Sequence, residues 1–149
     1  MTAFLPGPAV VAFYSYATGV SLELPVGFAP DDEDAESATY VDEDRQSARV
    51  QVRVVGAIDP GRDPREAAAA LADAFTRVGN EVLGKRELVV DQLPAFTVLT
   101  RRPDGWVLHQ TVLAGDGRLV TVVGMVPPGE DELPGQLDTA IESIRMIVL

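Results

Sequence analysis

The chain has 149 residues, with 12 Lys and Arg against 23 Asp and Glu, one histidine and no cysteine. A chain of this length can bury one hydrophobic core, so we expect a single domain over residues 1–149. The lack of cysteine excludes disulfides, thiolate zinc sites, iron–sulfur clusters and cysteine nucleophiles. The net charge of −11 would repel a phosphate backbone and no basic run offsets it, so we expect no nucleic-acid partner.

The first 17 residues are apolar, but they lack a basic region and contain Pro6 and Pro8. This segment is a poor signal peptide and is too short to span a bilayer. We therefore expect no membrane insertion and a cytoplasmic location. The cell envelope is the alternative if a leader upstream of Met1 is missing.

The clearest strand covers residues 47–55, where apolar and polar side chains alternate. Ala48, Val50 and Val52 fall on one face, which indicates a strand with one buried side. The polar face carries Arg49, Gln51 and Arg53. Shorter strands are expected at residues 13–17, 20–24 and 37–41.

A helix is expected to follow these strands. Asp63 is placed as its N-cap, Pro64 occupies the first helical position, and Glu66 completes a capping box. The apolar stripe continues to about Val78, and Gly79 supplies the stop signal.

The C-terminal half predicts a meander of strands at residues 87–91, 95–101, 106–113 and 119–126, separated by short turns. A final helix is expected to carry Leu137, Ile141 and Ile144 on one face, with Arg145 near its end. Short links favour antiparallel pairing. The predicted fold class is α+β, with an antiparallel sheet of about six to eight strands and two main helices.

Residues 31–44 include eight acidic side chains and are expected to form a solvated, mobile loop that leads into an edge strand. Carboxylates could gather a hard cation such as Ca²⁺, but these lack the ligand spacing and the central glycine of a calcium loop. Solubility explains the run without any metal.

Two further motifs have ordinary structural interpretations. Residues 79–86 nearly match a phosphate-binding loop, but they follow a helix, precede a strand and have Arg86 where Ser or Thr is needed, so a helix cap and loop are expected. His109, the single histidine, cannot form a multi-histidine site and is expected to be a satisfied or half-exposed side chain of the sheet. The sequence thus predicts no catalytic residues, no metal and no cofactor.

Arg49, Gln51 and Arg53 are the candidate binding residues. Two arginines on one strand face form a local positive spot in an acidic chain, and arginine is suited to forked recognition of carboxylates. The ordinary alternative is a solvated sheet face, or pairing of these arginines with acidic residues of a neighbouring strand.

The residues from Gly19 to Phe28, GVSLELPVGF, contain a short strand that runs into "LPxG" and an aromatic residue. This opening resembles PsbP-like domains, including the actinobacterial LpqN group and domains related to type VI effector chaperones. The helix after Asp63-Pro64, the meander and the closing Ile141-Ile144-Arg145 extend the likeness over most of the chain. The resemblance implies an α/β/α-like sandwich and members that act by binding other proteins.

We therefore expect a non-enzymatic, protein-binding domain, adaptor or chaperone-like, that uses an exposed sheet face or an edge strand and forms a homodimer in one version of the hypothesis. The alternative is a small-ligand-binding protein or an uncharacterised hydrolase. That alternative would use a cleft between sheet and helix, with Arg49, Arg53 or His109 as polar contacts.

Overall fold

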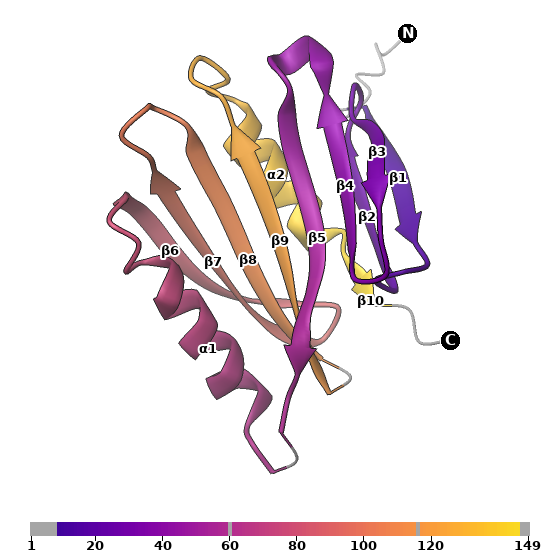
Figure 1. The fold of residues 1–149 in the computed structure, drawn as a ribbon, viewed down its shortest axis with the longest axis vertical. Helices are drawn as coiled ribbons and strands as arrows, with labels where there is room; N and C mark the ends of the chain where they lie inside the picture. The colour runs from indigo at the N-terminus through magenta and orange to yellow at the C-terminus, as the bar shows by residue number, and fades with distance from the viewer. Residues whose placement is uncertain (1–8, 60, 116, 147–149) are drawn as a thin grey trace, which may run out of the picture.

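The computed structural model describes residues 9–146, except residues 60 and 116. Within these residues, ten strands and two α-helices are arranged in two antiparallel sheets (Figure 1). The strands are β1 (Val10–Ser15), β2 (Val20–Pro25), β3 (Ala29–Glu33), β4 (Ser37–Asp42), β5 (Ala48–Ala57), β6 (Glu81–Val90), β7 (Leu93–Arg101), β8 (Val107–Gly115), β9 (Arg118–Val126) and β10 (Arg145–Met146). The helices are α1 (Pro64–Phe75) and α2 (Leu133–Glu142).

The larger sheet has seven strands in the order β3-β4-β5-β9-β8-β7-β6. Strands β6 to β9 form the predicted meander, in which each strand pairs with the next along the chain. The antiparallel α+β class and the number of strands in this sheet are confirmed.

The smaller sheet contains β1, β2 and β10, and the sequence did not predict it as a separate sheet. Its third strand comes from the end of the chain: Arg145 and Met146 pair with Ser21 and Val20. The prediction that Arg145 ends the last helix was therefore wrong. Helix α2 ends at Glu142, so Ile144 is buried outside the helix and Arg145 belongs to a strand.

One face of the larger sheet packs against α1. The N-cap is as predicted: the Asp63 carboxylate accepts a hydrogen bond from the Arg65 backbone N–H, and Pro64 begins the helix. In the described residues, Glu66 makes no hydrogen bond that would complete the predicted capping box. The helix ends at Phe75 rather than at Val78. It lies mainly on β7 and β8, where Ala68 and Ala72 are buried. The core on this side is completed by Val98, Val112 and Ala114.

The other face is covered by α2 together with the smaller sheet (Figure 1). This is the main core, to which both sheets and α2 contribute apolar side chains. Its largest fully buried members are Val20, Leu22, Leu24, Val50, Val52, Val90, Leu113, Ile141 and Ile144. The layers are therefore α1, the larger sheet, and then α2 with the smaller sheet, in agreement with the expected sandwich.

The acidic segment was predicted only in part: the strand expected at residues 37–41 is confirmed as β4, but the loop expected before it contains a further strand, and it is this strand rather than β4 that lies at the edge of the sheet. Residues 29–33 form β3, an edge strand of the larger sheet, and residues 37–42 form β4, whose side chains are all buried. The side chains of β3 are all exposed. A strand at the edge of a sheet can be acidic because its carboxylates stay in water, so composition alone did not reveal the strand.

The segment 79–86 was also assigned wrongly in part. Gly79 has the left-handed φ of 82°, but β6 begins at Glu81, so the residues expected to form a loop are mostly strand. The first strand likewise runs from Val10 to Ser15, earlier than the expected 13–17. Apolar alternation is weak in both segments because they lie at sheet edges.

The "LPxG" turn has a packing role. Gly27 has φ 117°, and a Cβ there would overlap the Oδ2 atom of Asp42. Asp42 is buried, and its Oδ2 accepts a hydrogen bond from Arg45 Nη1 at 2.6 Å. Arg45 Nη1 also donates to the carbonyl of Val26 at 3.2 Å. The turn is therefore fastened to the end of β4, and Phe28 is placed in the core.

Candidate protein-binding surface

Helix α1 covers only part of its face of the larger sheet. It packs mainly on β7 and β8, and the strand order places β9, β5, β4 and β3 beyond it. The side chains of β4, β5 and β9 on this side, which α1 does not contact, are called the open face here, although those of β4 and of Thr121 are buried by their neighbours. They are Ser37, Thr39, Val41, Arg49, Gln51, Arg53, Thr121, Val123 and Met125.

The structure brings Arg49, Gln51 and Arg53 together on the open face. Arg49 and Arg53 are exposed and Gln51 is half-buried, whereas Val50 and Val52 between them point into the main core. The alternation predicted for this strand is therefore confirmed. The pleat places every second side chain on one side, so the three candidates form one row along β5.

The strand register places each candidate between defined neighbours. Arg49 lies between Val41 and Met125. Gln51 lies between Thr39 and Val123. Arg53 lies between Ser37 and Thr121. Val123 and Met125 are half-exposed, so the open face combines two arginines with apolar groups that water reaches.

The arginines of the open face do not follow the expected alternative of pairing with acidic neighbours. Within the described part of the chain, neither Arg49 nor Arg53 has a carboxylate oxygen within 4.0 Å. Backbone N–H donation from Glu36 is the main reason that the pKa of Asp34 is lowered, and the charge of Arg53 contributes least. Both guanidinium groups are therefore available to an external carboxylate.

A hollow of about 420 Å³ lies where the open face meets α1. Leu71 and Phe75 of the helix form one wall, and Gln51 and Arg53 of β5 contribute to the other. The remaining lining residues are Glu36, Val54, Val55, Thr121 and Val123. An apolar side chain could enter this hollow while a neighbouring carboxylate reaches Arg53.

His109 lies on the opposite side of the larger sheet. It is 2% exposed, and its Nε2 atom is 2.7 Å from Oδ1 of Asp138 on α2. The expectation of a satisfied sheet histidine is therefore confirmed. The sheet itself separates His109 from Arg49 and Arg53, so the structure does not bring these three residues into one cleft.

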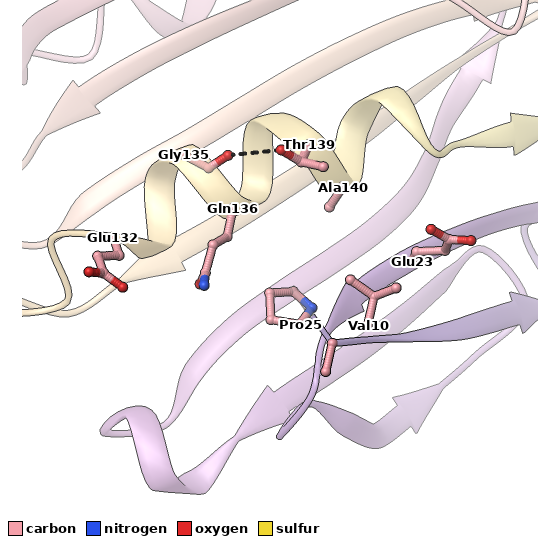
Figure 2. A pocket seen from close by; sticks show the side chains of 9 residues that line it. Val10, Glu23, Pro25, Glu132, Gly135, Gln136, Thr139 and Ala140 are labelled. Atoms are coloured by element: carbon pink, nitrogen blue, oxygen red, sulfur yellow. Dashed lines mark hydrogen bonds between the residues drawn. The ribbon is translucent and has the colours of Figure 1, made fainter. Parts of the chain in front are cut away.

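A groove of about 410 Å³ lies between α2 and the β1–β2 hairpin (Figure 2). Val10, Pro25 and Ala140 give it an apolar lining, and Glu23 and Glu132 lie at its two ends in the view of Figure 2. The backbone N–H of Glu23 donates to Ser143 Oγ at 2.8 Å, and Pro25 has no N–H. The edge of β2 beside this groove therefore offers few donors to an added strand.

The sequence did not indicate this groove. Its walls come from the hairpin near the start of the chain and from α2 near the end, and only the packing of these elements brings them together. In the described residues, no group of three or more acidic or histidine side chains could hold a metal ion. Nor does any described helix have the length and apolar character that crossing a bilayer requires.

No profile of a known protein family matches the chain, and no curated protein matches its sequence. Solved structures do match its fold. A Bacteroides thetaiotaomicron protein has a TM-score of 0.64 at 10% identity over 92% of this chain, which spans 48% of that protein. LpqN of Mycobacterium tuberculosis, involved in cell envelope biogenesis, has a TM-score of 0.55 at 10% identity, and the match covers 94% of this chain and 91% of LpqN.

The cyanobacterial PsbP of Synechocystis, CyanoP, has a TM-score of 0.63 at 14% identity. The match covers 98% of this chain and 97% of CyanoP. At identities this low, the matches show that the backbone fold is similar. They do not identify binding residues of this chain. The chain therefore has the PsbP-like fold, shared with LpqN, that the sequence motifs resembled.

Proposed function

We propose that this chain is a non-enzymatic protein-binding domain, with an adaptor or chaperone-like role, and that its partner docks on the open face. One observation carries the proposal: Arg49 and Arg53 lie on a half-covered sheet face without a carboxylate partner in the described chain. In a chain of net charge −11, two such cations on one strand are a local exception.

The chemistry of the open face defines the partner's chemistry. The guanidinium groups favour carboxylates, which they can bind with two parallel hydrogen bonds. Val123 and Met125 favour apolar side chains at the same site, and the hollow beside Phe75 can receive one of them. The partner is therefore a protein segment in which Asp or Glu residues stand next to apolar residues.

The test compares capture of partners by the native chain and by an Arg49→Ala/Arg53→Ala variant, with proteins identified by mass spectrometry. Arg62→Ala/Arg77→Ala is the matched control, because it removes the same charge from two other exposed arginines. A stoichiometric protein that the first variant loses and the control retains would support the proposal. Retention by Arg49→Ala/Arg53→Ala would exclude these arginines as the binding site.

A small-ligand-binding role is the second candidate, and the groove between α2 and the β1–β2 hairpin favours it over a cleft that includes His109. Its volume of about 410 Å³ is in the range of small-molecule sites. A thermal-shift screen of metabolites tests this role. A ligand whose stabilising effect disappears in Gln136→Ala would support it, because Gln136 lines the groove (Figure 2).

Three further predictions accompany the proposal. Residues 1–149 form one domain, which the match over nearly the whole of CyanoP supports. The chain has no catalytic activity of its own. Its location is the cytoplasm, with the cell envelope as the alternative because LpqN, which shares the fold, is involved in envelope biogenesis. Fractionation of the source cells with an antibody to the chain separates these locations.

A further inference from the structure

The two edges of the larger sheet differ in how they are protected. β3 has five residues, which include Pro30 and three acidic side chains, and its register is interrupted between Pro30 and Asp32. Short length, proline, charge and a bulge all discourage a sheet edge from pairing with another strand. β3 is therefore a protected edge.

The opposite edge, β6, also has charged side chains and a register shift between Val82 and Gly84, but it is long and contains no proline. It is ten residues long, and in the described part of the chain β7 is its strand partner. Val82, Leu83 and Val89 are exposed on it, and Val89 is 74% exposed. A long edge with exposed apolar side chains and unpaired backbone groups can pair with another strand.

The register of the β6–β7 hairpin shows which backbone groups of β6 are free. Asp91 and Gln92 both have positive φ and form a two-residue turn flanked by the pair Val90–Leu93. In such a turn the flanking pair is hydrogen-bonded, and bonded and non-bonded pairs then alternate along the ladder. The N–H and C=O groups of Lys85, Glu87 and Val89 therefore point away from β7.

The charges of β6 are complementary to those of a second β6. Lys85 and Glu87 project on the same side of the sheet, and both have free backbone groups. In a two-fold symmetric antiparallel pair, the central residue of β6 faces the same residue of the second copy. If Lys85 or Glu87 were the central residue, identical charges would therefore lie opposite each other. Pairing centred on Arg86 instead places Lys85 opposite Glu87 of the partner subunit, and it does so twice because the arrangement is two-fold symmetric.

The Arg86-centred register also satisfies the other constraints. Two arginines would meet at the two-fold axis, and each lies 3.5 Å from its own Asp138 Oδ1, which offsets part of their repulsion. Arg65 contacts Glu87 through Oε1 alone, with Nε donating at 2.7 Å, so Oε2 of Glu87 is left for Lys85 of the partner subunit. β6 carries Glu81, Lys85, Arg86 and Glu87, so its formal charge is balanced in an otherwise acidic chain.

We propose that β6 pairs antiparallel with β6 of a second copy of this chain, centred on Arg86, and joins the two larger sheets into one. The pairing leaves the open face free, because three strands separate β6 from β5. It is therefore independent of the proposed protein-binding role.

The first test uses the absence of cysteine from the sequence. In an Arg86→Cys variant the two new thiols would face each other in a non-hydrogen-bonded pair, about 4.5 Å between Cα atoms, which a disulfide can bridge. Val89→Cys is the control, because residue 89 is more exposed but would lie far from its own copy in this register. Under mild oxidation, we expect a cross-linked dimer from Arg86→Cys and at least tenfold less from Val89→Cys.

A second test keeps Arg86 and exchanges charges. Lys85→Glu and Glu87→Lys alone each place like charges opposite each other, so each variant should dimerise about tenfold more weakly in sedimentation equilibrium. Mixing the two variants restores both opposite-charge pairs and should restore dimerisation. Circular dichroism confirms that each variant is folded.

The outcomes separate the proposal from its competitors. Cross-linking of Arg86→Cys alone, with recovery in the mixed pair, supports it. A native chain that sediments as a monomer at every concentration overturns it, and leaves β6 to a strand of another protein. Equal cross-linking of both cysteine variants, or no recovery on mixing, also overturns it, because the copies would then meet elsewhere or in another register.

Discussion

A hydrogen bond of 2.7 Å between His109 Nε2 on β8 and Asp138 Oδ1 on α2 connects the helix to the sheet. The histidine side chain is 2% exposed and the aspartate side chain is 47% exposed. The contact therefore spans the boundary between core and solvent. Opposite His109 on β9 lies Gly124, where a side chain would meet Leu137, so α2 approaches the sheet closely at this point.

Removal of the Asp138 carboxylate should destabilise the fold. Asp138→Ala leaves a buried ring nitrogen of His109 without its partner, and an unsatisfied buried polar group costs about 1–3 kcal/mol. Urea unfolding measures the change. Glu142→Ala is the control, because it removes an exposed carboxylate from the same helix and should change stability by less than about 0.5 kcal/mol. Equal losses in both variants would contradict a specific role for Asp138.

The turn at Gly27 should not tolerate a side chain. Gly27→Ala combines a positive φ with an overlap against the buried Asp42 carboxylate, so we expect a loss of about 2 kcal/mol or more in the free energy of unfolding. Gly56→Ala is the matched control, since nothing lies within 4 Å of a Cβ there. If Gly27→Ala unfolds at the same urea concentration as the control, the fastened turn is not important for stability.

The lowered pKa of Asp34, which lies between β3 and β4, should make the stability of the fold depend on pH. Its Oδ1 accepts hydrogen bonds from the backbone N–H groups of Glu36 and Ser37, at 2.8 and 2.9 Å. These bonds favour the charged carboxylate and lower its pKa below the ordinary 3.8. Because this pKa is lower in the folded than in the unfolded chain, the ionised carboxylate stabilises the fold at pH values above the unfolded-state pKa. This stabilisation is lost as the pH falls through the folded-state pKa.

Nuclear magnetic resonance titration of the Asp34 carboxyl measures that pKa directly. In parallel, the stability of the native chain relative to Asp34→Asn should decrease as the pH is lowered from 5 to 2.5, because the asparagine does not titrate. A titration midpoint at or above 3.8 would show that the two backbone bonds do not persist in solution.

Loss of Arg49 and Arg53 should affect binding without affecting folding. Both side chains are exposed and have no carboxylate within 4.0 Å in the described chain, so Arg49→Ala and Arg53→Ala should each change stability by less than about 0.5 kcal/mol. Thermal unfolding followed by circular dichroism checks this. A larger loss would identify the arginines as structural, and a binding defect in these variants would then have an indirect cause.

Local patterns predicted the elements that have one buried face. The alternation in β5 correctly separated Val50 and Val52 from Arg49 and Arg53, because a half-buried strand must place every second residue in the core. Asp63 and Pro64 correctly marked the start of α1, because capping depends on adjacent residues. Edge strands were predicted less well: β3 and most of β6 have exposed side chains on both faces and so show no alternation.

Local sequence patterns were sufficient to predict the α+β class, the meander, the N-capped helix and the row formed by Arg49, Gln51 and Arg53, since each depends on residues close together in the chain. Tertiary packing places this row on an open face, because α1 packs on β7 and β8 rather than on β5. The same packing pairs β10 with β2, brings His109 to Asp138 and leaves β6 at an edge of the larger sheet. These contacts join residues that are far apart in the sequence. They depend on strand order and helix packing, which local periodicity does not reveal.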